Sequence, residues 1–208
     1  IFLPLLGTIA DYTHLKKRMM LMFAYIGAIA TILLFFTRDD MLIGGTNGAI
    51  LYSSILLIIA NLCFGAAVVF YNAFLPEIAS PDRRDAVSSQ GFALGYLGGG
   101  LLLLINLGML TQMEDTALAV RLSLASAGVW WLAFTYLYPQ RRLKQRVAAR
   151  ELPPGSNLLT HGIKELIRTL KKLYRQYPQT LRFLIAYLVY NDGVQTVIIV
   201  STAFAADE

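Results

Sequence analysis

The stretch AILYSSILLIIANLCFGAAVVFYNAFLP, residues Ala49–Pro76, decides the fold because it contains no Asp, Glu, Lys or Arg. A helix needs about 20 consecutive apolar residues to cross the hydrocarbon core of a bilayer, and this stretch is longer than that. Lipid offers no hydrogen-bond partners to the backbone, and the stretch lacks the alternation of a membrane β-strand. The sequence therefore predicts a membrane-spanning α-helix here.

Similar stretches lie on both sides of it. Hydrophobic residues make up 56% of the 208 residues and charged residues 15%, whereas a soluble domain carries about 25% charged residues. A lone soluble domain and a disordered chain are therefore excluded, and the predicted fold is an all-α membrane protein, a polytopic helix bundle. Residues 1–10 are interpreted as the end of a further helix, so that the chain is a fragment of a longer protein. The other predicted spans are roughly Met19–Thr37, Gly91–Leu110, Leu122–Tyr138 and Leu181–Thr202.

The basic residues alternate between successive connections. Connections 11–18, 77–90 and 139–182 hold three, two and eleven Lys or Arg, whereas 38–48 and 111–121 hold one each. Loops rich in Lys and Arg face the cytoplasm in membrane proteins. We therefore expect 11–18, 77–90 and 139–180 to be cytoplasmic. This topology accounts for the net charge of +5, so no nucleic-acid partner is expected.

The long basic connection carries an amphipathic helix of its own. Its apolar residues recur at steps of three and four, which places them on one helix face. Two interpretations stay open: the helix lies in the lipid interface with its basic residues near anionic headgroups, or it packs against the ends of the bundle. The apolar residues are Leu159, Ile163, Leu166, Leu170, Leu173 and Tyr177, and the basic ones are Lys164, Arg168, Lys171, Lys172 and Arg175.

The first short connection carries a motif. Gly7 precedes Asp11 by four residues, and Lys16-Lys17-Arg18 follow. Glycine permits close helix approach, and the aspartate can accept hydrogen bonds from a helix N-terminus or an arginine. The arrangement resembles the G-x-x-x-D-x-x-G-R-[RK] signature between helices 2 and 3 of the major facilitator superfamily, with His14-Leu15 in place of the second glycine and its neighbour.

The resemblance implies a domain organisation. The chain then covers about helices 2 to 7 of a major-facilitator-type bundle, in which a long loop joins two six-helix halves. Residues 1–138 form the amino-terminal half-bundle, residues 139–180 form the cytoplasmic linker, and residues 181–208 begin the other half.

Three further strings narrow the family. Gly91, Gly95 and Gly99 recur at every fourth position, a spacing that allows close helix packing. Their run resembles the antiporter motif G-x-x-x-G-P-x-G-G, but Tyr96 replaces its proline, so antiport is not carried over. The strings YNAFLPEIA (71–79) and YNDGVQTV (190–197) resemble bacterial relatives of the fungal vacuolar amino-acid effluxers linked to autophagy. This resemblance implies solute transport, with amino-acid efflux in the eukaryotic members.

Asp192 is the one acid well inside a predicted span. It lies about 16 Å along the helix from Leu181, near the middle of a core about 30 Å thick. A carboxylate there costs at least a few kcal/mol unless it faces a wet cavity or a partner. Asp192 with Asn191, Gln195, Asn72 and Tyr71 is the candidate site for a polar solute or a coupling proton. A structural hydrogen-bond cluster between helices is the alternative.

The cytoplasmic loops supply a candidate gate, in which Arg83 or Arg84 pairs with Asp11. A solvated loop cluster is the alternative interpretation. The gating residues predicted from the motif and this loop are Gly7, Asp11, Lys17, Arg18, Arg83 and Arg84.

The predicted function is a monomeric secondary transporter in the plasma membrane. It moves a small solute through the bilayer by alternating access. No cofactor or metal is expected, and proton or ion coupling is left open. A membrane-embedded signalling or scaffold protein is the alternative. An intramembrane enzyme is disfavoured because the spans contain no paired acids, histidine cluster or nucleophile motif.

Overall fold

The computed structural model describes residues 6–7, 10, 12, 14–38, 45–144 and 158–207. All regular structure in these residues is helical, which confirms the all-α prediction. The chain divides into two compact units, Ile1–Leu158 and Leu159–Glu208, which are described separately. The elements are α2 (Lys16–Leu33), η1 (Leu34–Phe36), α3 (Gly45–Asn72), α4 (Leu75–Ile78), α5 (Arg84–Gln112), α6 (Thr116–Thr135), η2 (Tyr136–Gln140), α7 (Leu158–Gln176) and α8 (Pro178–Asp207).

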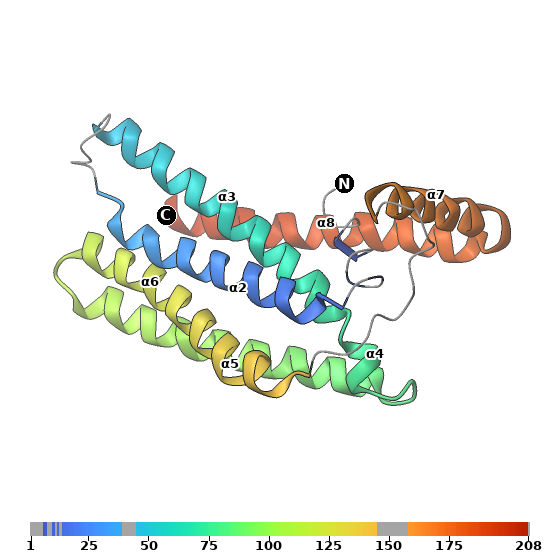
Figure 1. Ribbon diagram of the computed structural model, residues 1–208. Coiled ribbons are helices and arrows are strands. Elements are labelled where there is room, and N and C mark those ends of the chain that lie inside the picture. The colour runs from blue at the N-terminus through green and yellow to red at the C-terminus, as the bar shows by residue number, and fades with distance from the viewer. Residues whose placement is uncertain are drawn as a thin grey trace. The chain divides into compact units, whose positions relative to one another are not determined.

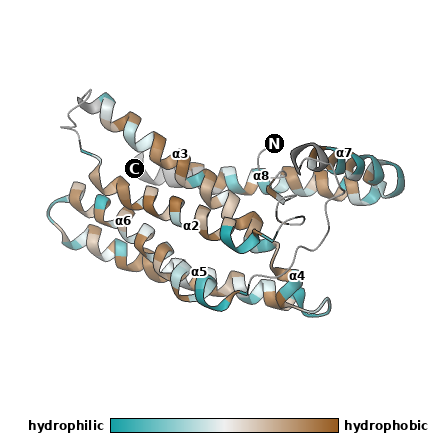
Figure 2. Ribbon diagram, in the orientation of Figure 1, coloured by the Kyte–Doolittle hydropathy of each residue, from teal (hydrophilic) through white to brown (hydrophobic). Residues whose placement is uncertain are grey.

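Four segments within the described residues are long and apolar enough to cross a membrane. They coincide with the first four predicted spans, and Figure 2 shows hydrophobic residues along much of α2, α3, α5 and α6. The fifth predicted span lies inside α8, which is not one of the four, and its crossing stays a prediction. The four segments are Lys16–Phe36, Asn47–Ile78, Arg84–Gln112 and Thr116–Gln140.

In the first unit α2 lies between α3 and α6, and α5 packs against α6 (Figure 1). Buried small and aromatic side chains, among them Ala66 and Phe70, join α2 to α3. The start of α6 is fixed by Asp115, whose carboxylate accepts a hydrogen bond of 2.9 Å from the Leu118 N–H, because an N-cap oxygen satisfies an unpaired donor of the first helical turn.

The crossing of α2 and α6 depends on two glycines. A Cβ at Gly128 would lie 2.8 Å from the carbonyl oxygen of Ala28 and 2.7 Å from Ile32 Cγ1. A Cβ at Gly27 would clash with the ring of Trp131. Small residues allow such close approach between helices in membranes. The sequence analysis missed both glycines, because only the structure shows which helices are neighbours.

We expect Gly128→Val to lower the free energy of unfolding by about 1–3 kcal/mol, the usual cost of overpacking. The added side chain meets backbone atoms of α2, which cannot rotate away. Thermal unfolding of the full-length protein in detergent measures the effect. Gly108→Val in α5 is the matched control, because it has the same helix-propensity cost and a Cβ there meets nothing within 4 Å. Equal losses in both variants would contradict the close crossing.

The predicted glycine stripe lies on α5, of which no residue is buried. A Cβ at Gly95 or Gly99 would meet no described atom within 4 Å, and a Cβ at Gly91 would lie 3.3 Å from Tyr71 Oη. No helix of the described chain packs closely on Gly95 or Gly99. Close packing along this stripe therefore stays a prediction.

Lysine contacts bring three connections to the same end of the first unit. Lys16 Nζ donates to the carbonyl oxygen of Ala73 at 3.2 Å. Lys17 Nζ donates to the carbonyl oxygens of Gln140 and Leu143 at 2.8 and 2.5 Å. The starts of α2 and α4 and the end of η2 therefore lie together, and we call this the basic end.

Candidate functional site

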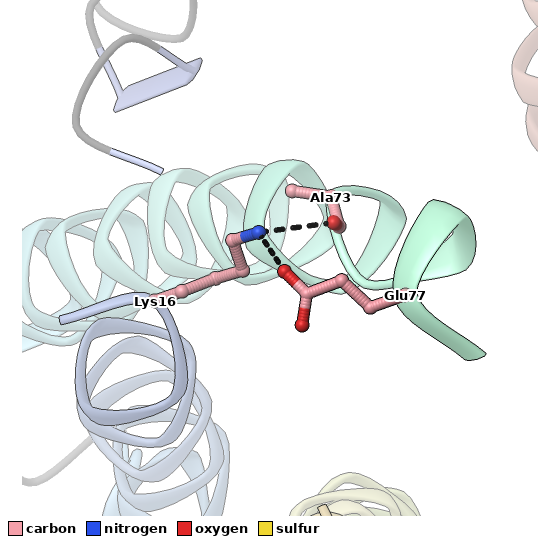
Figure 3. Close-up of polar contacts among 3 residues, drawn as sticks. All are labelled: Lys16, Ala73 and Glu77. Atoms are coloured by element: carbon pink, nitrogen blue, oxygen red, sulfur yellow. Dashed lines mark hydrogen bonds and ion pairs between the residues drawn. The ribbon is translucent and has the colours of Figure 1, made fainter. Parts of the chain in front are cut away.

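Lys16 stands at the centre of a buried polar cluster at the basic end (Figure 3). It is the first residue of α2 and only 6% exposed. Its ammonium forms an ion pair with Glu77 of α4, donates to the Ala73 carbonyl, and lies 5.5 Å from the centre of the Phe74 ring. We call these four residues the Lys16 cluster.

The position of Lys16 requires such partners. A cation in the first turn of its own helix is opposed by the macrodipole of that helix, whereas the carboxyl end of a neighbouring helix attracts it. Ala73 directly follows α3, and its carbonyl faces the ammonium. The Glu77 carboxylate supplies the opposite charge, and its side chain is only 19% exposed. The cluster thus fastens the start of α2 to the end of α3 and to α4.

A pocket of about 420 Å³ lies beside this cluster, between the end of α3, α4 and the first turns of α5. We call it the Tyr71 pocket. Its described lining is largely apolar and contains no charged side chain. Asn72 supplies a side-chain amide to the lining, and Ser88 supplies an aliphatic hydroxyl. Four of its lining residues are aromatic: Tyr71, Phe74, Phe92 and Tyr96.

The pocket brings together residues that the sequence analysis placed in separate groups. Tyr71 and Asn72 are predicted solute-binding residues, and Gly91 and Gly95 belong to the predicted packing stripe. The absence of side chains on the two glycines leaves the space that forms the pocket. A Cβ at Gly95 would meet nothing within 4 Å.

Both lysines of the first connection hold a wall of this pocket. Phe74 lines the pocket and also lies under the Lys16 ammonium. Leu143 lines it too, and the Leu143 carbonyl accepts a hydrogen bond from Lys17. Pockets of a few hundred Å³ with apolar walls and a few polar groups are typical of small-molecule sites. The arrangement can hold a small solute whose bound part is uncharged.

The other predicted gating residues do not belong to the Lys16 cluster. Asp11 lies outside the described residues, so its predicted pairing with Arg83 or Arg84 stays a prediction. Gly7 is half-buried, whereas Arg18 and Arg83 are exposed. Arg84 Nε is buried and has no hydrogen-bond partner among the described residues.

The polar group on α8 belongs to the second unit. Asn191, Asp192 and Gln195 are all exposed within the described residues. Thr196 Oγ1 donates to the backbone carbonyl of Asp192 at 2.9 Å, so the Asp192 carboxylate takes no part in this hydrogen bond. Asp192 and Gln195 are three residues apart on one helix and therefore share a face. Their role in solute binding stays a prediction.

Comparison with known proteins identifies the family. Residues 1–208 match the sequence profile of the family described as "Vacuole effluxer Atg22 like". The chain belongs to this Atg22-like family. The resemblance inferred from the glycine and YNDGVQTV strings is thereby confirmed.

Relatives of this Atg22-like chain are named as transporters or as autophagy-related proteins. The "Uncharacterized MFS-type transporter YxiO" of Bacillus subtilis (strain 168) is 31% identical over 98% of this chain and 46% of the relative. Autophagy-related protein 22-1 of Penicillium rubens is 26% identical over 94% of this chain and 43% of its own length. Autophagy-related protein 22 of Yarrowia lipolytica is 25% identical over 96% of this chain and 45% of its own length.

The Atg22-like chain spans less than half the length of these curated relatives. No solved structure matches it. The family, the helical architecture and the four membrane-compatible segments together make it part of a multi-pass membrane protein of the major facilitator type. The relatives' names point to transport rather than to catalysis.

Sequence reasoning missed two members of this site in the Atg22-like chain. The motif drew attention to Lys17 and Arg18, whereas Lys16 is the buried residue. Glu77 has no predicted role in the sequence analysis beyond its place in the string YNAFLPEIA (71–79). The signal that could have found it is its place as the first acid after a long charge-free stretch, opposite a basic connection.

Proposed function

We propose that the full-length protein is a secondary transporter that moves a small solute by alternating access, with the Tyr71 pocket on the path of the solute. The observation that carries this proposal is the pocket itself, whose lining residues Phe74 and Leu143 are held by Lys16 and Lys17. Major facilitator transporters rock two half-bundles around a site between them. The names of the relatives support the same activity.

The Lys16 cluster then has a definite part in the proposed cycle. Both charged partners belong to the first unit, so the ion pair stiffens this half-bundle rather than joining it to the other half. A stiff half-bundle keeps the pocket walls in place while the halves rock. This differs from the predicted gate, in which Asp11 would bond across the interface.

The direction, membrane and solute are further parts of the proposal. The basic end faces the cytoplasm, as the distribution of Lys and Arg favours. The plasma membrane is the proposed location, and the transporter acts as a monomer. An amino acid is the first solute to test, because the resemblance to fungal amino-acid effluxers implies it. Asp192 is the proposed carrier of a coupling proton.

Solute uptake by the full-length protein in proteoliposomes tests the proposal. We expect Gly95→Leu to lower the initial rate of uptake about tenfold or more, because the new side chain fills the pocket at a site where the backbone leaves room. Gly108→Leu is the matched control, since it lies on the same helix, has equal free space and does not line the pocket. Equal rates of uptake in both variants would show that the pocket does not lie on the path of the solute. A folded wild-type protein without any uptake would favour the signalling or scaffold alternative.

A further inference from the structure

Helix α7 carries an apolar face that is exposed in the second unit. Leu170 is 51% exposed and Tyr174 is 73% exposed. At 3.6 residues per turn, the apolar side chains fall within an arc of about 120°. They are Ile163, Leu166, Ile167, Leu170, Leu173 and Tyr174.

The basic residues occupy a separate arc of the same helix. This second arc is about 100° wide and does not overlap the apolar one. Glu165 is the one acidic residue of α7, and it pairs with Arg168 at 3.5 Å. The helix therefore presents a strong excess of positive charge next to its exposed apolar face. The basic residues are Lys164, Arg168, Lys171, Lys172 and Arg175.

We propose that α7 binds the surface of an anionic lipid leaflet and lies flat at the level of the headgroups. A helix with one apolar face and one basic face inserts its apolar side into the headgroup boundary, and its cations attract anionic lipids. The charge of α7 is complementary to phosphatidylglycerol and related headgroups, and its apolar face matches the acyl boundary beneath them.

The connection to α8 is consistent with a membrane surface as the occupant. Tyr177 is the single residue between α7 and α8. The predicted span begins at Leu181, five residues after Gln176, a separation of at most about 18 Å for an extended chain. In the predicted topology the end of α7 is therefore tethered close to the membrane surface, and a tether of this length makes the local concentration of that surface high. Tyrosines such as Tyr174 and Tyr177 are also typical of the membrane interface.

Spin labels on the full-length protein test the proposal. Single cysteines replace Leu170, at the centre of the apolar face, or Lys172, on the basic face, in a Cys63→Ser background. The protein is reconstituted in vesicles of phosphatidylcholine alone or of phosphatidylcholine with phosphatidylglycerol. In the anionic vesicles we expect the label at 170 to collide with lipid-dissolved oxygen and the label at 172 with a water-soluble nickel chelate. Neutral lipid or high salt should lower the immersion of the label at 170.

Charge variants read at position 170 give the matched controls. Lys171→Gln with Lys172→Gln should lower the ratio of embedded to free helix about 25-fold, since each basic residue contributes about fivefold. Glu165→Gln should raise the ratio about fivefold on the same basis. Equal immersion in neutral and anionic vesicles would overturn the proposal. So would a label at 170 shielded from both oxygen and nickel, which would mean that α7 packs on protein.

Discussion

Lys16→Ala is expected to lower the free energy of unfolding by about 3 kcal/mol, because it leaves the Glu77 carboxylate without its partner in a largely buried place. The Ala73 carbonyl and the Phe74 ring lose their cation as well. Thermal or denaturant unfolding of the full-length protein in detergent measures the loss. Arg18→Ala is the matched control: it removes a basic residue two positions away that is exposed, and it should change stability by less than about 0.5 kcal/mol.

A double variant separates the ion pair from simple packing. Lys16→Met with Glu77→Met should recover much of the stability lost in Lys16→Ala, because an apolar pair can replace a buried ion pair at little cost. A loss in the double variant equal to the sum of the losses in Lys16→Met and Glu77→Met measured singly would show that the two side chains do not interact. Equal stability of Lys16→Ala and Arg18→Ala would show that the cluster does not form.

Asp192→Asn is expected to abolish accumulation of solute against a gradient while leaving expression and folding intact. The variant keeps the size and most of the hydrogen bonding of the side chain but removes the charge, and a charge inside a membrane span is typically functional. Uptake into proteoliposomes with and without a pH gradient measures accumulation, and exchange across the membrane should be retained.

The control for this variant is Asp82→Asn. Asp82 is an exposed acid in the connection before α5, so its replacement removes the same charge without touching a span. Concentrative uptake by Asp192→Asn at the wild-type level, with an unchanged pH profile, would exclude the charge from the mechanism. In that case Asn191, Asp192 and Gln195 would be a structural polar cluster.

The helices of the first unit could be predicted because lipid imposes a simple requirement on the sequence. A segment such as Ala49–Pro76 must satisfy its own backbone and must avoid charge, so its C-terminal end is visible as Pro76 and the return of charge at Glu77. The amphipathic helix α7 was equally visible, because its apolar residues keep one period over the whole of the helix. Pro178 ends that pattern and also begins α8, since proline is tolerated in the first turn of a helix.

The contacts between helices could not be predicted in the same way. Gly27 and Gly128 differ from Gly95 and Gly99 only in what lies opposite them, and a sequence does not state which helices are neighbours. Lys16, Lys17 and Arg18 are adjacent basic residues, and the register of α2 alone decides that the first is buried. Residues from the end of α3 and from the start of α5 line the Tyr71 pocket. The pocket therefore forms only when the connection between these two helices is folded.

Phe74 belongs both to the Lys16 cluster and to the Tyr71 pocket, and this sharing has a thermodynamic consequence. If a bound solute changes the strength of the contact between Lys16 and the ring, then the loss of that contact changes the affinity for the solute by the same factor, because coupling between two equilibria is reciprocal. Electrostatic attachment of α2 and occupancy of the pocket are then one linked equilibrium. Under that condition the affinity of the half-bundle for the proposed solute depends in part on Lys16, which does not line the pocket.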